Sequence, residues 1–447
     1  MMSVDQTIVN SREALALEII RDLRSRRHQA YLVGGCVRDR LLGNVAKDYD
    51  VSTDAPPQAI VSYFPESQTV GAHFGVVLVS RGKDVQIEVA TFRSEGLYSD
   101  GRHPGQVRFE TDPALDAKRR DFTINGLMED PLSGRILDYV GGRADLAAKT
   151  IRAIGDPNER FREDHLRMLR AIRFAARLNF SIEPRTLAAI QGEASQISKI
   201  SSERIRDELV RILTERRAAR GLQLLDESSL LTHILPQVKA FQGVEQPPEF
   251  HPEGDVWTHV LLMLQEMGAA NSTLALGVLL HDVGKPLTFR IADRIRFDGH
   301  AEVGARLAQE ILSQLKFPNE DIEQVTSLVA NHMRFKDVRQ MRLSTLKRFL
   351  RLPRFEEHLE LHRLDCLASN GYTDSYDFVR EKLAELEQDE LRPPRLIRGD
   401  DLIRLGYEPG PQFGGALDAV ETAQLEGEVR TREQALALAR SVLDMAH

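Results

Sequence analysis

The chain has 447 residues, of which 42% are hydrophobic and 28% are charged, and its formal net charge at pH 7 is −8. This length and hydrophobic content predict a folded protein of two to four domains, and no run approaches the roughly twenty apolar residues of a membrane span. The acidic charge argues against a surface that binds nucleic acid everywhere, although a local basic groove is compatible with it.

The cysteine content and the first residues favour a cytoplasmic location. Cys36 and Cys366 are too few and too far apart for a disulfide framework, which fits a reducing compartment. Residues 1–20 follow an amphipathic helix pattern and lack the charged-then-apolar plan of a signal peptide. The sequence leaves the oligomeric state open.

The first part of the chain is predicted to be a mixed α/β domain. Between residues 30 and 150, short strand-like runs alternate with glycine turns and short helical patterns. We expect strands at residues 30–33, 48–52, 76–80 and 85–90.

Helices are expected for the rest of the chain. From residue 158 the pattern changes to long helical periods with few glycines, as in residues 165–178 and 204–213. Arginine recurs through residues 152–220, where it either contacts phosphate groups or forms ion pairs with the interleaved acids. The proline-rich residues 247–254 separate this region from a second helical unit.

A glycine pair after the first strand is predicted to bind phosphate. Gly34 and Gly35 follow an apolar run and precede a short helix pattern, which Gly43 is expected to end. Glycines at such a turn leave backbone N–H groups free to meet phosphate oxygens. A tight turn with no ligand is the alternative.

Two alternating carboxylates follow this turn. Residues two apart on a strand point to one face, so Asp48 and Asp50 can hold divalent cations side by side beside a nucleoside triphosphate. An Asp-x-Asp pair alone also occurs at ordinary surface turns, and the neighbouring glycines are what favour a site. Glu88 is a further carboxylate near this position.

Two later segments suit the same ligand. Arg119 and Arg120 offer guanidinium groups to triphosphate oxygens, and Asp121 suits ribose hydroxyls. Residues 90–104 are predicted to form a polar loop interrupted by glycines. Movement of this loop, with Asp100 and Arg102, would change the shape of a neighbouring pocket. The alternative for residues 119–121 is a surface ion-pair cluster, and the alternative for residues 90–104 is a loop that only connects two elements.

The segment Glu163–Arg167 is predicted to open a helix and to read a base. Asp164 and Arg167 are three apart and therefore neighbours on one helix face. A carboxylate beside a guanidinium matches the pairing edges of cytosine and adenine and leaves groups unpaired against uracil and guanine. An intrahelical salt bridge is the alternative interpretation.

Together these motifs resemble the class II tRNA nucleotidyltransferase and bacterial poly(A) polymerase family. The matching segments, in order, are GGCVRDRLLG with DYD, ATFRSEGLYSDGRHP, RRDFTINGL, DYVGGRADL, EDHLR and ERIRDEL. The resemblance covers roughly the first half of the chain. It implies a polymerase beta-like head followed by an all-α neck, body and tail, and an enzyme that adds CCA to tRNA 3′ ends from CTP and ATP without a nucleic-acid template.

The resemblance also implies roles for single residues. Asp48 and Asp50 are implied as the catalytic Mg²⁺ ligands, and the flexible loop contains Asp100 and Arg102. The residues implied in nucleotide binding are Gly34, Gly35, Arg38, Arg119, Arg120, Asp121, Asn125, Glu163, Asp164, Arg167 and Arg170. The expected domains are the head at residues 12–150, the neck at 151–215, the body at 216–253, an HD domain at 254–371 and a helical tail at 372–447.

The second half resembles the HD-domain phosphohydrolases. Imidazoles and carboxylates at the ends of successive helices can gather divalent transition metals, which would activate water against a phosphoester. A degenerate tail retained for its shape is the alternative. The candidate metal ligands are His259, His281, Asp282, His300, His332 and Asp365, with Lys285 as a phosphate contact.

Other activities are compatible with the same motifs. The complete loop at residues 90–104 favours adenosine addition, and residues 71–75 lack the arginine-rich segment of poly(A) polymerases. An enzyme that adds only the terminal A stays open. A phosphohydrolase whose first half only holds RNA, and a non-catalytic RNA-binding scaffold, are further hypotheses.

Overall fold

The computed structural model describes residues 4–70, 75–82, 85–96, 107–386 and 391–445. The chain divides into two compact units, Met1–Lys239 and Ala240–His447. The finer division into head, neck, body, HD domain and tail stays a prediction.

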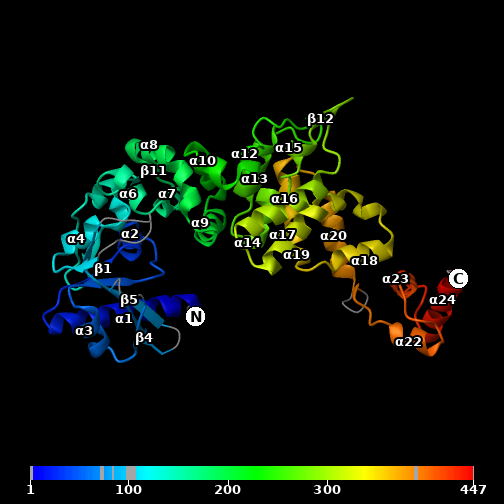
Figure 1. The fold of residues 1–447 in the computed structure, drawn as a ribbon, viewed down its shortest axis with the longest axis horizontal. Helices are drawn as coiled ribbons and strands as arrows, with labels where there is room; N and C mark the ends of the chain where they lie inside the picture. The colour runs from blue at the N-terminus through cyan, green and yellow to red at the C-terminus, as the bar shows by residue number, and fades with distance from the viewer. Residues whose placement is uncertain (1–3, 71–74, 83–84, 97–106, 387–390, 446–447) are drawn as a thin grey trace. The chain divides into compact units, whose positions relative to one another are not determined.

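The first part of unit 1 is the α/β domain that the sequence predicts (Figure 1). In the described residues its main sheet has the strand order β3-β4-β5-β2-β1-β8-β9, and only β2 and β5 pair in parallel. Strands β6 (Arg93–Glu95) and β7 (Val107–Phe109) form a separate antiparallel pair. The strands of the main sheet are β1 (Ala30–Val33), β2 (Asp50–Thr53), β3 (Ser67–Thr69), β4 (Val76–Arg81), β5 (Val85–Thr91), β8 (Met128–Asp130) and β9 (Arg135–Leu137).

The apolar β1 is the buried centre of this sheet. All four of its residues are buried between β2 and β8. Helix α1 (Val4–Ser25) contacts the sheet and buries its Ile19, Ile20 and Leu23 completely. The other short helices of this part are α2 (Gly35–Leu41), α3 (Pro57–Tyr63), α4 (Pro113–Lys118), η2 (Thr123–Asn125) and α5 (Gly142–Ala147).

Helices make up the rest of unit 1, as predicted. Helix α7 (Leu166–Leu178) is central because it packs against α9 (Ser202–Thr214) and α10 (Ala218–Glu227). It ends where Asn179 adopts a left-handed conformation with φ 57°. The remaining elements are β10 (Thr150–Ile151), β11 (Ser181–Ile182), α6 (Pro157–Glu163), α8 (Pro184–Glu193), η3 (Ala194–Lys199), α11 (Leu230–Ile234) and α12 (Pro236–Lys239).

In its described residues, unit 2 consists of helices and the short hairpin of β12 (Arg290–Ile291) and β13 (Ile295–Arg296). One apolar core contains Phe335, Phe349 and Phe355, and a separate core forms within the last helices around Leu402 and Leu443. Its helices are α13 (Val256–Glu266), α14 (Ser272–Leu280), α15 (Lys285–Thr288), α16 (His300–Gln314), α17 (Asn319–Asn331), η4 (His332–Gln340), α18 (Leu343–Leu350), α19 (Phe355–Ala368), α20 (Asp374–Glu385), α22 (Gly399–Arg404), α23 (Gln412–Leu425) and α24 (Arg432–Asp444).

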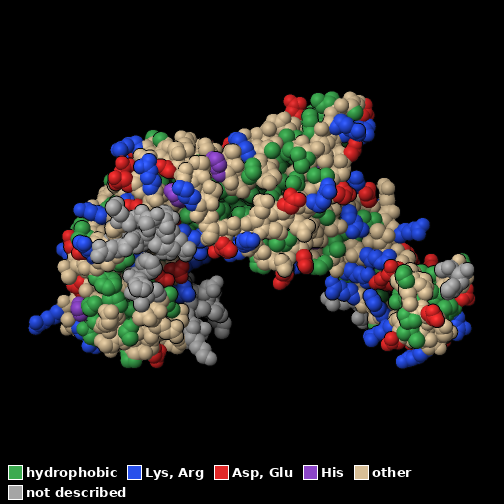
Figure 2. Space-filling view, viewed as in Figure 1, with side chains coloured by type: hydrophobic (Ala, Val, Ile, Leu, Met, Phe, Trp, Pro, Cys, Tyr) green, Lys and Arg blue, Asp and Glu red, His purple; other side chains and the backbone are tan. Residues whose placement is uncertain are grey.

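The surface of unit 2 carries a local basic region. Figure 2 shows Lys and Arg side chains gathered between α18 and α23. Arg351, Arg392 and Arg395 line a small pocket there, together with Glu421 and Gln424. Among the described helices, none combines the length and the apolar composition needed to cross a lipid bilayer.

Candidate active site and metal centre

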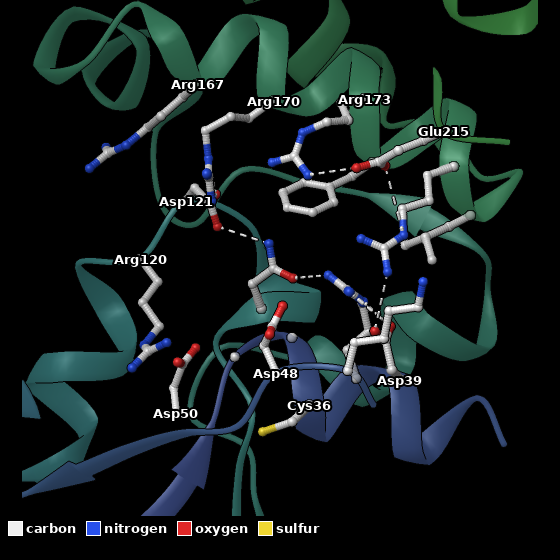
Figure 3. Close-up of a pocket in the computed structure, with 18 of the residues that line it drawn as sticks. Cys36, Asp39, Asp48, Asp50, Arg120, Asp121, Arg167, Arg170, Arg173 and Glu215 are labelled. Carbon is white, nitrogen blue, oxygen red and sulfur yellow. Dashed lines mark hydrogen bonds and ion pairs between the residues drawn. The ribbon is translucent and has the colours of Figure 1, made fainter. Parts of the chain in front are cut away.

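The predicted head residues come together around one pocket of about 1170 Å³ in unit 1 (Figure 3). Helix α7 and the turn after β1 supply opposite parts of its lining. Glu163 is not part of this lining. The predicted residues that line it are Gly34, Gly35, Arg38, Asp48, Asp50, Arg119, Arg120, Asp121, Asn125, Asp164, Arg167 and Arg170.

The strand-to-helix turn at the base of the pocket is the one that the sequence predicts. Gly34 precedes α2 with φ 72°, a conformation that residues with a side chain rarely adopt. A Cβ atom at this position would also lie 3.3 Å from Nη1 of Arg120. Gly43, with φ 72°, follows the last turn of α2, as predicted. The turn therefore keeps its backbone open toward the pocket.

Asp48 and Asp50 both present their carboxylates to the pocket, with Arg120 beside Asp50 (Figure 3). The prediction that both belong to one strand is wrong, because β2 begins at Asp50. Its partner β1 ends at Val33, opposite Asp50, where the chain turns into α2. Asp48 therefore has no strand to pair with; its side chain is 83% exposed and lies 2.8 Å from Nη1 of Arg12.

Negative charge converges on Asp50. Burial raises the pKa of Asp50 to about 6, and the carboxylates of Glu88 and Asp48 add to this effect against the opposing charge of Arg120. Glu88 is its direct neighbour in the parallel pairing of β2 with β5. A partly buried carboxylate with two acidic neighbours fits a divalent cation, whose charge would offset the repulsion.

A buried aspartate holds both predicted triphosphate arginines. Asp116 is completely buried, and its carboxylate accepts hydrogen bonds from Arg119 at 2.6 Å and from Arg120 at 3.1 Å. These pairs outweigh the effect of burial and lower the pKa of Asp116. Arg120 also donates to the hydroxyl of Ser52 at 3.2 Å. Both guanidinium groups are thus fixed at the pocket before a ligand binds.

Asp121 accepts four hydrogen bonds from the protein. Arg170 donates two of them to Oδ2, at 2.6 and 2.8 Å, and the backbone of Phe122 and the amide of Asn125 donate to Oδ1. Arg170 and these hydrogen bonds outweigh burial and lower the pKa of Asp121 to about 2. Asn125 in turn accepts a hydrogen bond from Arg38 at 2.7 Å. Asp121 therefore positions Arg170 and Asn125, and its predicted contact with ribose stays a prediction.

The predicted base-reading segment differs in one respect from the sequence expectation. Glu163 ends α6 and α7 begins at Leu166, so Asp164 lies in the break between two helices rather than on a helix face. Its carboxylate accepts the Leu166 backbone N–H at 3.1 Å, which keeps it at the start of α7. Arg167 pairs with Glu163, whereas Asp164 pairs with Arg204 of α9 at 3.0 Å. The loop residues Asp100 and Arg102 lie outside the described residues.

A second cluster lies in unit 2, where the predicted HD ligands meet. His281 and Asp282 follow α14, His300 begins α16, His332 follows α17, and Asp365 lies near the end of α19. One group of possible ligand atoms belongs to His259, His281 and Asp365, and a second to Asp282, His300 and His332. Within each group all of the atoms lie within 4.8 Å of one another.

The donor set fits a divalent metal. His300 and His332 face each other with 3.2 Å between their Nε2 atoms, while each Nδ1 donates to a backbone carbonyl. Two imidazole lone pairs at this distance repel each other unless a cation lies between them. The pKa values of both rings are lowered, chiefly by burial, that of His332 to about 3. Nε2 of His259 lies 3.2 Å from Oδ1 of Asp365, and Nε2 of His281 lies 3.1 Å from Oδ2 of Asp282.

Charged groups of opposite sign surround this centre. His281 and Lys285 outweigh the effect of burial and hold the pKa of Asp282 well below its usual range. Burial alone would lower the pKa of His259, but hydrogen bonds with Asp365 and Glu253 raise it to about 9. Lys285 Nζ lies 2.6 Å from Asp282. The predicted HD residues therefore form one cluster of groups with opposite charges, which is buried except for Asp365.

Comparison with known proteins agrees with this arrangement. Residues 30–152 match the poly A polymerase head domain, residues 179–242 match the "Probable RNA and SrmB- binding site of polymerase A", and residues 255–364 match the HD domain. The CCA-adding enzyme of Levilactobacillus brevis is 33% identical over 431 residues, which cover 95% of this chain and 96% of that protein. The chain belongs to the CCA-adding enzyme family.

Other members of this family are also similar to this chain over nearly its whole length. The CCA-adding enzyme of Geobacillus thermodenitrificans is 31% identical, and the alignment covers 94% of both chains. The crystal structure of the Bacillus stearothermophilus CCA-adding enzyme in complex with CTP has a TM-score of 0.74 and 27% identity, and the match covers 100% of this chain and 99% of that one. The predicted fold and family are confirmed.

The structure adds pocket residues to this family member that sequence reasoning missed. Phe174 of α7 has the guanidinium groups of Arg38, Arg170 and Arg173 within 5.5 Å of its ring centre. The i, i+3 spacing of Arg170 and Arg173 was the available signal, since it places both on the face of α7 that carries Arg167. The other additions near the two centres are Asp39, Asp116, Arg177, Arg204, Glu215, His251 and Glu253.

Proposed function

We propose that this chain adds CCA to the 3′ end of tRNA from CTP and ATP without a nucleic-acid template. The observation that carries the proposal is the pocket of unit 1 described above, in which Asp48, Asp50, Asp164 and the fixed arginines surround a space large enough for a nucleotide. Family membership and the CTP complex of the Bacillus stearothermophilus relative support it. A cytoplasmic location fits this activity.

Different head residues would bind the metal and the triphosphate during nucleotidyl transfer. Asp48 and Asp50 would hold Mg²⁺, which supplies Lewis-acid activation of the tRNA 3′-hydroxyl and charge compensation for pyrophosphate. Arg119 and Arg120, fixed by Asp116, bind triphosphate oxygens without having to be ordered first. The open backbone at Gly34 accommodates a phosphate group.

Base selection comes from the break between α6 and α7. Asp164 offers a carboxylate to the amino group that cytosine and adenine share, and Arg167 offers N–H donors to the adjacent ring nitrogen. Uracil and guanine present a carbonyl and an N–H at these positions and leave the same side chains unpaired. The protein therefore takes the place of a template.

Nucleotide incorporation tests the proposal directly. Purified protein should incorporate labelled CTP and ATP, but not UTP or GTP, into tRNA that lacks its terminus. Asp48→Ala with Asp50→Ala should abolish incorporation, and activity in this double variant would refute the metal-ligand assignment. Long tails from ATP alone would favour poly(A) synthesis, and addition of a single A only to tRNA ending in CC would favour an A-adding enzyme.

The cluster in unit 2 favours a second activity. We propose that His259, His281, Asp282, His300, His332 and Asp365 hold one or two divalent transition metals for phosphoester hydrolysis, with 2′,3′-cyclic phosphates at RNA ends as substrates. The metals would supply an activated water. Lys285 lies beside Asp282 and is placed to contact a phosphate.

The two activities should separate by mutation. Asp282→Ala should remove cyclic-phosphate hydrolysis and leave nucleotide incorporation unchanged, because the described residues that line the incorporation pocket all belong to unit 1. Loss of both activities in this variant would argue for one shared site. Hydrolysis that persists in it would refute the assignment to the HD cluster.

A further inference from the structure

The four histidines of the HD cluster present their rings in the same way. The Nδ1 atoms of His281, His300 and His332 lie 2.7–2.9 Å from the backbone carbonyl oxygens of the residues three positions earlier. A carbonyl oxygen only accepts, so Nδ1 carries the hydrogen in each ring. Each Nε2 is then the atom that faces the centre.

His259 reaches this arrangement by a different contact. Its Nδ1 lies 2.7 Å from Oε1 of Glu253, while its Nε2 lies 3.2 Å from Oδ1 of Asp365. Among the four histidines it is the one whose Nδ1 donates to a charged side chain. A carboxylate is a stronger acceptor than a carbonyl, so it fixes the tautomer more firmly and makes the opposite nitrogen a better electron donor.

The side chain of Glu253 is held in place by its own contacts. Its side chain is 6% exposed, and the same Oε1 also accepts from Nδ1 of His251 at 2.9 Å. The rings of His251 and His259 meet edge to face with centroids 5.0 Å apart. His251 therefore holds the carboxylate in place against His259.

We infer that Glu253, supported by His251, is a positioning residue that orients His259 and strengthens it as a metal ligand. This inference rests on the proposed metal site in unit 2 and does not depend on the chemistry of unit 1. Outer carboxylates that accept from a metal-bound histidine typically contribute 10- to 100-fold to metal affinity. The inference assigns a function to the segment His251–Glu253, which lies before α13 and outside the predicted ligand set.

Metal titration of the full chain tests the inference. After chelator treatment, the affinity for Co²⁺ is measured by calorimetry in the wild type, Glu253→Gln and Glu253→Ala. Glu253→Ala should weaken binding roughly 10- to 100-fold, and Glu253→Gln should lie between it and the wild type because the amide oxygen still accepts but carries no charge. Glu249→Gln is the matched control, because Glu249 is an exposed glutamate in the same connection before α13.

A purely structural role gives a different result. It would lower the melting temperature of the metal-free protein and leave unchanged the increase that Co²⁺ produces, whereas a positioning role reduces that increase. Equal Co²⁺ affinity in wild type and Glu253→Ala would overturn the inference and leave the proposed metal site standing. Absence of Co²⁺ binding by the wild type would overturn both. Nucleotide incorporation by every variant reports that unit 1 is folded, and the melting temperature of the metal-free protein reports on unit 2.

Discussion

The carboxylate of Asp164 accepts two hydrogen bonds from one guanidinium nitrogen of Arg204, at 3.0 and 3.3 Å. This contact joins the break between α6 and α7 to helix α9, while Arg167 pairs with Glu163. The two proposed base-reading side chains are thus held by separate partners rather than by each other. Asp164 precedes α7 and Arg167 lies in its first turn, so the start of this helix sets their spacing.

We predict that Arg204→Met reduces discrimination between bases. Without its partner, Asp164 can rotate and no longer rejects the carbonyl of uracil at a fixed position, so the preference for CTP over UTP should fall by about tenfold or more. Single-turnover incorporation of each triphosphate measures this ratio. Arg206→Met is the control, because Arg206 lies on the same helix and pairs with Asp207. An unchanged ratio in Arg204→Met would contradict the prediction.

Replacing Asp50 should stabilise the protein while it abolishes transfer. The pKa of Asp50 is raised to about 6 from an ordinary value of 3.8, so the folded state binds this proton more tightly than the unfolded state. The resulting loss of stability develops as the pH rises from 3.8 to 6 and stays complete above it. At pH 7.5 without metal, Asp50→Asn should raise the free energy of unfolding by about 1 to 3 kcal/mol.

Thermal unfolding in chelator at two pH values tests whether Asp50→Asn raises or lowers the free energy of unfolding. The gain from Asp50→Asn should be present at pH 7.5 and should largely disappear near pH 4, where the carboxyl of the wild type is already neutral. Asp48→Asn is the comparison variant, because its side chain is 83% exposed and should change stability little. A loss of stability in Asp50→Asn at pH 7.5 would contradict the proposed repulsion between Asp50 and the carboxylates of Glu88 and Asp48.

The pair between Asp121 and Arg170 should be structural as well as functional. Arg170→Met leaves the buried Asp121 carboxylate without two of its four hydrogen bonds and should cost about 2 to 3 kcal/mol. Urea unfolding measures the loss. Arg220→Met is the control, since the partly exposed pair of Arg220 with Glu227 should contribute less than about 1 kcal/mol. Equal losses of stability in the two variants would show that the buried pair contributes no more to stability than the exposed one.

The basic region between α18 and α23 should contact the tRNA backbone. Arg392 and Arg395 line its pocket, and a contact from each to a phosphate releases counterions. Arg392→Ala with Arg395→Ala should weaken tRNA binding and lower the slope of log affinity against log salt by about one unit per arginine. Arg432→Ala is the control, because Arg432 lies in α24 of the same unit and pairs with Asp401. An unchanged slope would exclude this surface from tRNA binding.

Much of the secondary structure follows from local pattern. The run from Ala30 to Val33 forms β1 at the predicted bounds, because an apolar run before two glycines suits a buried strand that turns into a helix. The strand expected at residues 48–52 starts two residues late, because its pairing with β1 stops where Gly34 turns the chain. Propensity alone cannot locate that limit, since it depends on the partner strand.

The residue types at both centres were readable from the sequence, because catalysis and metal binding require carboxylates, imidazoles and guanidinium groups at characteristic spacings. What only the tertiary structure decided is which of these side chains meet: Asp164 with Arg204, Asp121 with Arg170, and His259 with Glu253. Two of these pairs join residues 40 and 49 positions apart. Such contacts depend on how α7 packs against α9 and on where the chain places Asp121 beside α7. Packing geometry, unlike spacing along one element, is determined by the whole fold.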